Sequence, residues 1–111
     1  MPHYVPQRGD IVWINFTPQA GHEQTGKRPA LVVSPLIYNQ KVGLAVFCPI
    51  TSQVKGYPFE VVIPEGNKIR GVVLADQVKS LDYNHRKARF ISKLSSVATA
   101  EVLSKLMTLL Q

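Results

Sequence analysis

Short runs of β-branched and aromatic residues recur along this chain of 111 residues, each bounded by glycine, proline or polar turn residues. Runs of this kind are typical of β-strands. They lie at 11–16, 30–34, 44–50, 59–63 and 71–75, with a weaker one at 89–91. Because no helical pattern alternates with them, the sequence predicts a mainly β fold, a small antiparallel barrel or sandwich, and not a parallel α/β sheet. The run at 44–50 is almost wholly apolar, which predicts a central strand.

The end of the chain has a different period. Apolar side chains recur there at helical spacing, with polar ones between them, which predicts one amphipathic C-terminal helix that closes the fold. We expect the stripe of Val102, Leu106 and Leu110 to lie in the core. Glu101 and Lys105 stand four residues apart, in the order that favours an ion pair on an exposed helix face.

Composition and charge narrow the class of protein. Hydrophobic residues make up 45% of the chain and charged residues 18%, which is typical of a globular protein, and the length fits one domain over residues 1–111. Thirteen Lys and Arg against seven Asp and Glu leave a net charge of +6. An excess of this sign favours polyanions, so nucleic acid is the first partner to consider.

The cysteine and histidine content argues against a metal or a disulfide. Cys48 is the single cysteine, and His3, His22 and His85 lie far apart in the sequence. We therefore expect a buried, inert Cys48, a reducing compartment, and neither metal nor cofactor. No apolar run approaches the ~18 residues that cross a bilayer, and the first residues do not resemble a signal peptide. The expectation is a cytoplasmic protein that does not bind membranes.

Polar side chains with catalytic potential gather in three places between the predicted strands. The first is a polar loop at 19–29, which is longer than most connections, and long loops are often functional. The second and third follow directly after the strands that end at Ile50 and Ala75. The candidates are His22, Glu23, Gln24, Lys27 and Arg28 in the loop, Thr51, Ser52, Gln53 and Lys55 after the first of these strands, and Asp76, Gln77 and Lys79 after the second.

A base, a cation and a hydroxyl on a basic protein can cleave RNA without a metal ion, because the 2′-hydroxyl is a nucleophile already tethered beside the phosphorus. Glu23 could take the 2′-hydroxyl proton, Arg28 has a planar fork of donors that matches phosphate, and Thr51 could add a neutral hydrogen bond. Arginine is a poor proton donor near neutral pH. The acid for the leaving group is left open, with His22 the best-tuned side chain available.

Four motifs, in this order, resemble the MazF/PemK/Kid-type toxins of bacterial toxin–antitoxin pairs. They are Gly-Asp-Ile-Val-Trp at 9–13, the loop Gly-His-Glu-Gln-Thr-Gly-Lys-Arg-Pro at 21–29, Pro-Ile-Thr-Ser at 49–52, and Asp-Gln at 76–77. The resemblance spans essentially the whole chain. The stretches 55–61 and 74–80 make it most similar to the MazF branch.

The resemblance implies an SH3-like antiparallel barrel with a C-terminal helix and a homodimer. It also implies metal-independent, sequence-specific cleavage of single-stranded RNA, leaving a 2′,3′-cyclic phosphate or 3′-phosphate and a 5′-hydroxyl. The family's catalytic residues match Arg28 and Thr51, and its loop glutamate matches Glu23. A cognate MazE-like antitoxin with an acidic tail would cover the RNA groove, and contact with DNA would be indirect, through the antitoxin complex.

The sequence departs from the Kid-like pattern at one position. Kid-like members pair a loop histidine with an arginine two residues before the aspartate, whereas this chain keeps His22 and Asp76 but has Leu74 in the arginine position. The difference favours Arg28 as the main phosphate-handling residue and Asp76 as a base-reading or orienting group. Asp76 as the general base stays open as the weaker alternative.

Two other functions share this barrel and stay open at this point. One is a CcdB-like DNA gyrase poison, which the terminus Thr-Leu-Leu-Gln at 108–111 disfavours because those poisons end in Trp-Gly-Ile. The other is a non-catalytic RNA-binding barrel. We also expect Trp13 and Phe16 to be core or dimer-interface residues. Arg86, Lys87, Arg89 and Lys93 could either bind phosphate or protect a strand edge.

Overall fold

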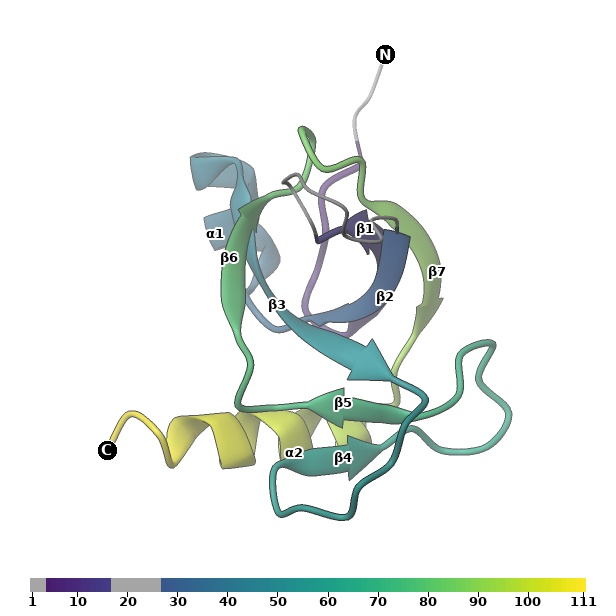
Figure 1. Ribbon diagram of the computed structural model, residues 1–111. Helices are drawn as coiled ribbons and strands as arrows, with labels where there is room; N and C mark the ends of the chain where they lie inside the picture. The colour runs from purple at the N-terminus through teal and green to yellow at the C-terminus, as the bar shows by residue number, and fades with distance from the viewer. Residues whose placement is uncertain (1–3, 17–26) are drawn as a thin grey trace, which may run out of the picture.

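The computed structural model describes residues 4–16 and 27–111, and it consists mainly of antiparallel strands with a helix at the C-terminus (Figure 1). This arrangement confirms the expected fold class. The elements are β1 (Asp10–Asn15), β2 (Lys27–Val32), α1 (Leu36–Val42), β3 (Leu44–Thr51), β4 (Glu60–Val62), β5 (Val72–Leu74), β6 (Lys79–Asp82), β7 (Arg89–Lys93) and α2 (Ser96–Met107).

Strand β3 is the centre of the sheet, as its apolar sequence predicts. It pairs with β2 along one side, while its other side pairs with β6 over residues 44–47 and with β5 over residues 50–51. The pairing path runs in the order β4-β5-β3-β2-β1-β7 without closing, so the described strands form an open, barrel-like sheet. Figure 1 shows β3 crossing between the upper strands and the β4–β5 pair that lies on α2.

Strands β1, β2 and β3 each contain an apolar run because both faces of the sheet are covered there. Ile11, Leu31 and Cys48 belong to one buried cluster, which includes Val102 of α2. The residues that alternate with them belong to a second cluster on the opposite face. That cluster contains Val12, Ile14, Ala30, Val32, Ala45, Phe47, Leu81 and Tyr83. Period-2 alternation therefore separates two cores instead of separating core from solvent.

Helix α2 is capped at one end and fastened to the sheet near the other. The Ser95 hydroxyl accepts a hydrogen bond from the Ala98 N–H at 3.2 Å, which satisfies one of the free donors of the first turn. The expected Glu101–Lys105 ion pair forms at 3.5 Å, and the same ammonium donates to the Pro58 carbonyl at 2.7 Å. The helix ends at Met107, so the prediction that Leu110 is a core residue was wrong, and 72% of it is exposed.

Two elements escaped the sequence analysis. Helix α1, which follows Pro35, was not predicted, and its buried Asn39 is held by a residue distant in sequence: its amide donates to the Pro6 carbonyl at 2.7 Å. Strand β6 was missed because Leu81 is its one buried residue. Within the described ranges, no helix has the length and apolar character needed to cross a membrane.

Strand β2 begins three residues earlier than the predicted strand at 30–34. Lys27, Arg28 and Pro29 were assigned to the preceding loop because they are polar or break strands. They extend β2 because they pair with β1, with Asn15 opposite Lys27 and Ile14 opposite Arg28. Pairing with β1 therefore outweighs the local sequence preference. Arg28, which was expected in the loop, lies on the sheet.

Candidate active site

The site lies where β2 and β3 stop pairing. Their last pair is Ala30 with Pro49, and beyond it β3 turns to pair with β5 through Ile50 and Val73. Proline has no N–H for a ladder hydrogen bond, so Pro49 on β3 and Pro29 on β2 help to end the pairing here. Continuing the register by two residues would place Arg28 opposite Thr51. Instead the start of β2 and the end of β3 move apart (Figure 1).

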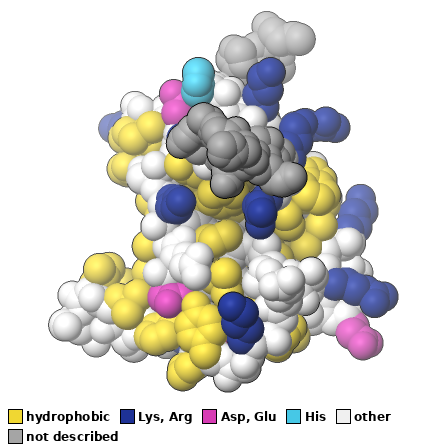
Figure 2. Space-filling view, viewed as in Figure 1, with side chains coloured by type: hydrophobic (Ala, Val, Ile, Leu, Met, Phe, Trp, Pro, Cys, Tyr) yellow, Lys and Arg dark blue, Asp and Glu magenta, His cyan; other side chains and the backbone are white. Residues whose placement is uncertain are grey.

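The first of two hollows beside this opening has a volume of about 690 Å³. We call it the cationic groove, and its lining includes Trp13, Arg28, Thr51, Ser52, Gln53, Lys68 and Arg70. Figure 2 shows Lys and Arg side chains spread around a largely uncharged middle on this face of the molecule. Among the described residues, the lining contains three cations and no carboxylate, and such a surface attracts an anionic chain.

The second hollow is smaller, about 220 Å³, and has a different chemistry. We call it the tyrosine pocket, and its lining includes Arg28, Thr51, Gln53, Lys55, Tyr57, Glu60 and Gln77. It has amide, phenol and carboxylate groups and two cations, and this mixture can read the edge of a nucleobase by hydrogen bonding. Arg28, Ile50, Thr51 and Gln53 line both hollows, and we call Arg28 and Thr51, which bring a guanidinium and a hydroxyl to this boundary, the ridge.

Hydrogen bonds fix the walls of the tyrosine pocket. The Tyr57 hydroxyl donates to Asp76 Oδ1 at 2.6 Å, and the backbone N–H groups of Lys55 and Gly56 each donate to the Glu60 carboxylate at 2.9 Å. The hydrogen bond to Asp76 raises the pKa of Tyr57 above its ordinary value. Tyr57 therefore stays a neutral phenol, and Asp76 is engaged as its acceptor.

The Thr51 hydroxyl is also held in place. Its Oγ1 accepts a hydrogen bond from the Gln53 N–H at 3.1 Å. A hydroxyl that accepts in this way still has its own O–H to donate to a ligand. Thr51 itself is half-buried at the end of β3, and Arg28 is exposed near the start of β2. The ridge thus offers a guanidinium fork and a hydroxyl donor from two different strands.

The structure brings together six of the residues selected from the sequence and separates others. Lys79 lies on β6 with its ammonium 5.9 Å from the centre of the Phe16 ring, and it lines neither hollow. Lys27 is the first residue of β2. His22, Glu23 and Gln24 fall outside the described residues. The residues gathered around the hollows are Arg28, Thr51, Ser52, Gln53, Lys55 and Gln77.

Four polar lining residues were not singled out from the sequence. Tyr57 and Glu60 lie in the 55–61 stretch that carried the family resemblance, so the motif itself was the available signal. Lys68 and Arg70 follow the turn residues at 65–67 and had no local signal beyond their charge. Their distance from Arg28 along the chain hides the fact that they share its groove.

The structure shows where several of the aromatic and basic residues discussed in the sequence analysis lie. Trp13 is 37% exposed in the groove, so it is not a core residue in the single chain, whereas Phe16 packs half-buried against the second core cluster. Arg86 donates to the Asn15 and Phe16 carbonyls, and Lys93 pairs with Asp10 at 2.8 Å. Arg86 and Lys93 therefore stabilise the fold through these contacts.

Cys48 is fully buried, as predicted, and burial together with the nearby charge of Asp76 raises its pKa to about 12. A thiol in this state is a packing residue and not a nucleophile. No group of three or more His, Cys, Asp or Glu side chains is placed to hold a metal ion in the part of the chain that the structure describes.

The curated proteins that are similar to this chain in sequence are named as endoribonucleases. Residues 7–110 match the family model described as PemK-like, MazF-like toxin of type II toxin–antitoxin system. The chain is 50% identical over 99 residues to "Endoribonuclease toxin MazF" of Escherichia coli K12, covering 89% of this chain and 86% of that protein.

Solved structures agree with the sequence comparison. MazF of Deinococcus radiodurans superposes with a TM-score of 0.88 at 54% identity, covering 97% of this chain and 98% of the other. A MazE–MazF crystal structure from the same organism gives a TM-score of 0.91 at 54% identity, with 97% of each chain covered.

Proposed function

Because the chain belongs to the PemK-like, MazF-like toxin family of type II toxin–antitoxin systems, it is an endoribonuclease toxin, and we propose that it cleaves single-stranded RNA at short sequence motifs without a metal ion. The observation that carries this proposal is the ridge: Arg28 and Thr51 come from different strands and line both hollows. A phosphodiester on the ridge would have a cationic groove on one side and a base-sized polar pocket on the other.

The proposed reaction uses the nucleophile that RNA contains. The 2′-oxygen attacks the adjacent phosphorus, the P–O5′ bond breaks, and the products are a 2′,3′-cyclic phosphate, which can open to a 3′-phosphate, and a 5′-hydroxyl. Arg28 neutralises the charge that grows on the phosphoryl oxygens, and the Thr51 hydroxyl donates to one of them. The Thr51 hydroxyl is already held by the Gln53 N–H, and donors fixed before the substrate binds favour electrostatic catalysis.

Proton transfer is assigned to the loop that precedes β2. In the proposal Glu23 accepts the proton of the 2′-hydroxyl and His22 gives one to the departing 5′-oxygen. Asp76 is the weaker candidate for the base because its carboxylate already accepts the Tyr57 hydroxyl at 2.6 Å. We assign Asp76 the role of orienting Tyr57 in the tyrosine pocket.

The remaining candidates bind RNA around the ridge. Gln53, Lys55 and Gln77 present amide and ammonium groups in the tyrosine pocket and are suited to reading a base. Ser52 lines the cationic groove. Gln24, Lys27 and Lys79 are assigned to the RNA strand beyond these hollows. The proposal includes no metal and no cofactor.

The proposed partners follow from the family. A MazE-like antitoxin with an acidic segment would compete with RNA for the cationic surface, and MazE–MazF crystal structures are among the structural relatives. The toxin would act in the cytoplasm as a homodimer and meet DNA only through its antitoxin complex. An acidic segment fits because the chain has a net charge of +6.

The proposed activity is tested by incubating the purified protein with a defined pool of RNA in EDTA and sequencing the 5′-hydroxyl ends. We expect cuts at one short motif, in EDTA as in buffer. Intact RNA, together with inhibition of DNA gyrase supercoiling by the same preparation, would support the gyrase poison instead. Binding of RNA without any cut would support the non-catalytic barrel.

A further inference from the structure

The segment of residues 64–71, between β4 and β5, is a fixed part of the molecule. Asn67 fastens it to β7: its side-chain amide donates to the Lys93 carbonyl at 3.0 Å, and its Oδ1 accepts from the Ser92 hydroxyl at 2.7 Å. The same Oδ1 also accepts from the Ile69 N–H at 3.1 Å, which holds the turn of the segment itself. We call this segment the 64–71 loop.

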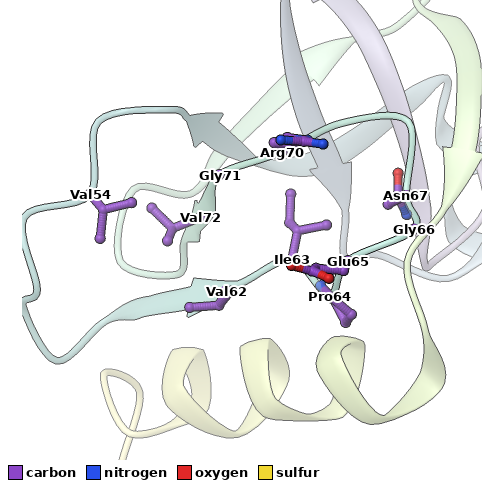
Figure 3. A pocket seen from close by; sticks show the side chains of 10 residues that line it. All are labelled: Val54, Val62, Ile63, Pro64, Glu65, Gly66, Asn67, Arg70, Gly71 and Val72. Atoms are coloured by element: carbon purple, nitrogen blue, oxygen red, sulfur yellow. The ribbon is translucent and has the colours of Figure 1, made fainter.

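The last residue of the loop packs directly on the catalytic ridge. Gly71 has a φ of +126°, and a Cβ placed on it would lie 2.2 Å from the Thr51 carbonyl oxygen. Its own carbonyl accepts from the Ile63 N–H at 3.0 Å, so the two ends of the loop are joined. In Figure 3, Arg70 and Gly71 lead into β5, and Asn67 lies at the turn of the loop. The backbones of the loop and of Thr51 therefore form one unit.

The loop contributes two cations to the lining of the cationic groove. Lys68 and Arg70 are exposed and line the cationic groove together with Arg28, Thr51 and Trp13. The ion pairs found within the described ranges are Lys93–Asp10 and Lys105–Glu101, so neither loop cation is neutralised there by a carboxylate. The groove volume of about 690 Å³ falls in the ~300–1,000 Å³ range of sites that enclose whole small molecules, which leaves space for a nucleotide beyond the scissile phosphate.

We propose that Lys68 and Arg70 form a second phosphate subsite, which binds an RNA phosphate neighbouring the one that is cut. This inference rests on the proposed endoribonuclease function and extends it. Arg28 and Thr51 act on the scissile phosphate, while the loop cations hold the strand in register and make no contact with the reacting atoms. The exposed Trp13 ring in the same groove offers a face on which the intervening base can stack.

The test uses RNA oligonucleotides that contain the cleaved motif with zero, one or two additional nucleotides at each end. A 2′-deoxy substitution at the scissile nucleotide prevents cleavage, so that affinity is measured alone. K68Q, R70Q and the double variant are compared with K41Q, which removes a positive charge from α1. Circular dichroism and thermal unfolding check that every variant is folded.

We expect the wild type and K41Q to bind the extended RNA more tightly than the minimal one, and the double variant to lose this gain. One lost phosphate contact, at a slope of ~0.7 for single strands, should make the double variant about 2.6-fold less sensitive to an increase in salt from 50 to 200 mM. On cleavable RNA, KM should rise while kcat changes little.

Two results separate this inference from the function on which it rests. If the wild type cleaves RNA but the double variant has the same length and salt dependence as K41Q, the subsite is wrong and the endoribonuclease function stands. If the double variant instead loses affinity only for an acidic antitoxin peptide, the loop belongs to the antitoxin interface and the subsite is again wrong. Failure of the wild type to cleave any RNA would contradict the proposed function itself.

Discussion

The cationic groove and the tyrosine pocket share a ridge and differ in almost everything else. The groove is large and carries Lys68 and Arg70, and no carboxylate lines it within residues 4–16 and 27–111. The pocket is about a third of that volume and is shaped by Glu60 and the Tyr57–Asp76 pair. A charge-rich surface holds any phosphate, whereas a small pocket with fixed donors and acceptors discriminates between bases. The comparison suggests that strength of binding and choice of sequence reside on opposite sides of Arg28 and Thr51.

Substitution of Arg28 or Thr51 should affect both hollows, because each residue lines the groove and the pocket. Arg28→Ala and Thr51→Ala each delete a donor to the phosphoryl oxygens, and loss of one such donor costs about 10²–10³ in kcat. We therefore expect RNA cleavage to become undetectable in a standard gel assay for either variant. Neither side chain is in the core, so the circular dichroism spectrum and the mass of the dimer should not change. Cleavage at the wild-type rate by both variants would refute the catalytic assignment.

A matched pair of glycine variants tests whether the ridge depends on the 64–71 loop. Gly71→Ala brings a methyl group against the Thr51 carbonyl, whereas Gly66→Ala meets nothing within 4 Å, and both positions have positive φ. The strain at Gly66 should lower the free energy of unfolding by about 1 kcal/mol without affecting cleavage. Gly71→Ala should lower it by about 2 kcal/mol or more and slow cleavage about 10²-fold, because small displacements of catalytic groups are costly.

Unfolding in urea and cleavage at a temperature where both glycine variants are folded would measure these effects. Equal cleavage by the two variants would show that Thr51 does not depend on its contact with Gly71.

Changes confined to the tyrosine pocket should alter the choice of sequence more than the rate. Tyr57→Phe and Asp76→Asn each disrupt the hydrogen bond that fixes the phenol. We expect the preference at one base position to fall about tenfold, which corresponds to ~1.4 kcal/mol. Sequencing of 5′-hydroxyl ends from a random RNA pool measures this preference directly. A loss of all cleavage in Asp76→Asn, with the preference intact in Tyr57→Phe, would restore Asp76 as the general base.

The smallest expected effect is a shift in the pKa of one tyrosine. The hydrogen bond to Asp76 raises the pKa of Tyr57 above its ordinary value of 10.0. The folded protein therefore keeps this proton longer than the unfolded chain, so the stability it contributes is present below about pH 10 and is lost as the pH rises through the folded pKa. Asp76→Asn should shift one tyrosine to lower pKa in an ultraviolet titration. An identical titration for both proteins would mean that the hydrogen bond does not form in solution.

Prediction from the sequence was most reliable where the residues of one segment determine its structure. The central position of β3, the buried Cys48 and the C-terminal helix all followed from local apolar runs. It failed where distant partners decide the structure. Helix α1 depends on Asn39 reaching Pro6, and β2 takes in Arg28 because β1 pairs with it.

The same distinction applies to the site. Arg28 and Thr51 were identified because they lie in motifs that resemble a known family. The contribution of Lys68 and Arg70 to the same groove was hidden, since only the folded 64–71 loop brings them into the groove that Thr51 also lines. The Tyr57–Asp76 hydrogen bond joins residues 19 apart in sequence and likewise had no local signature.

The central claim is that the RNA's own 2′-hydroxyl attacks a phosphate held by Arg28 and Thr51. The most direct measurement compares two oligonucleotides that contain the cleaved motif and differ by one oxygen, the 2′-hydroxyl of the scissile nucleotide. Both should bind with similar affinity, but the hydroxyl-bearing strand alone should be cut, in EDTA, to a 2′,3′-cyclic phosphate and a 5′-hydroxyl. Cleavage of the 2′-deoxy strand at the same bond would contradict this mechanism.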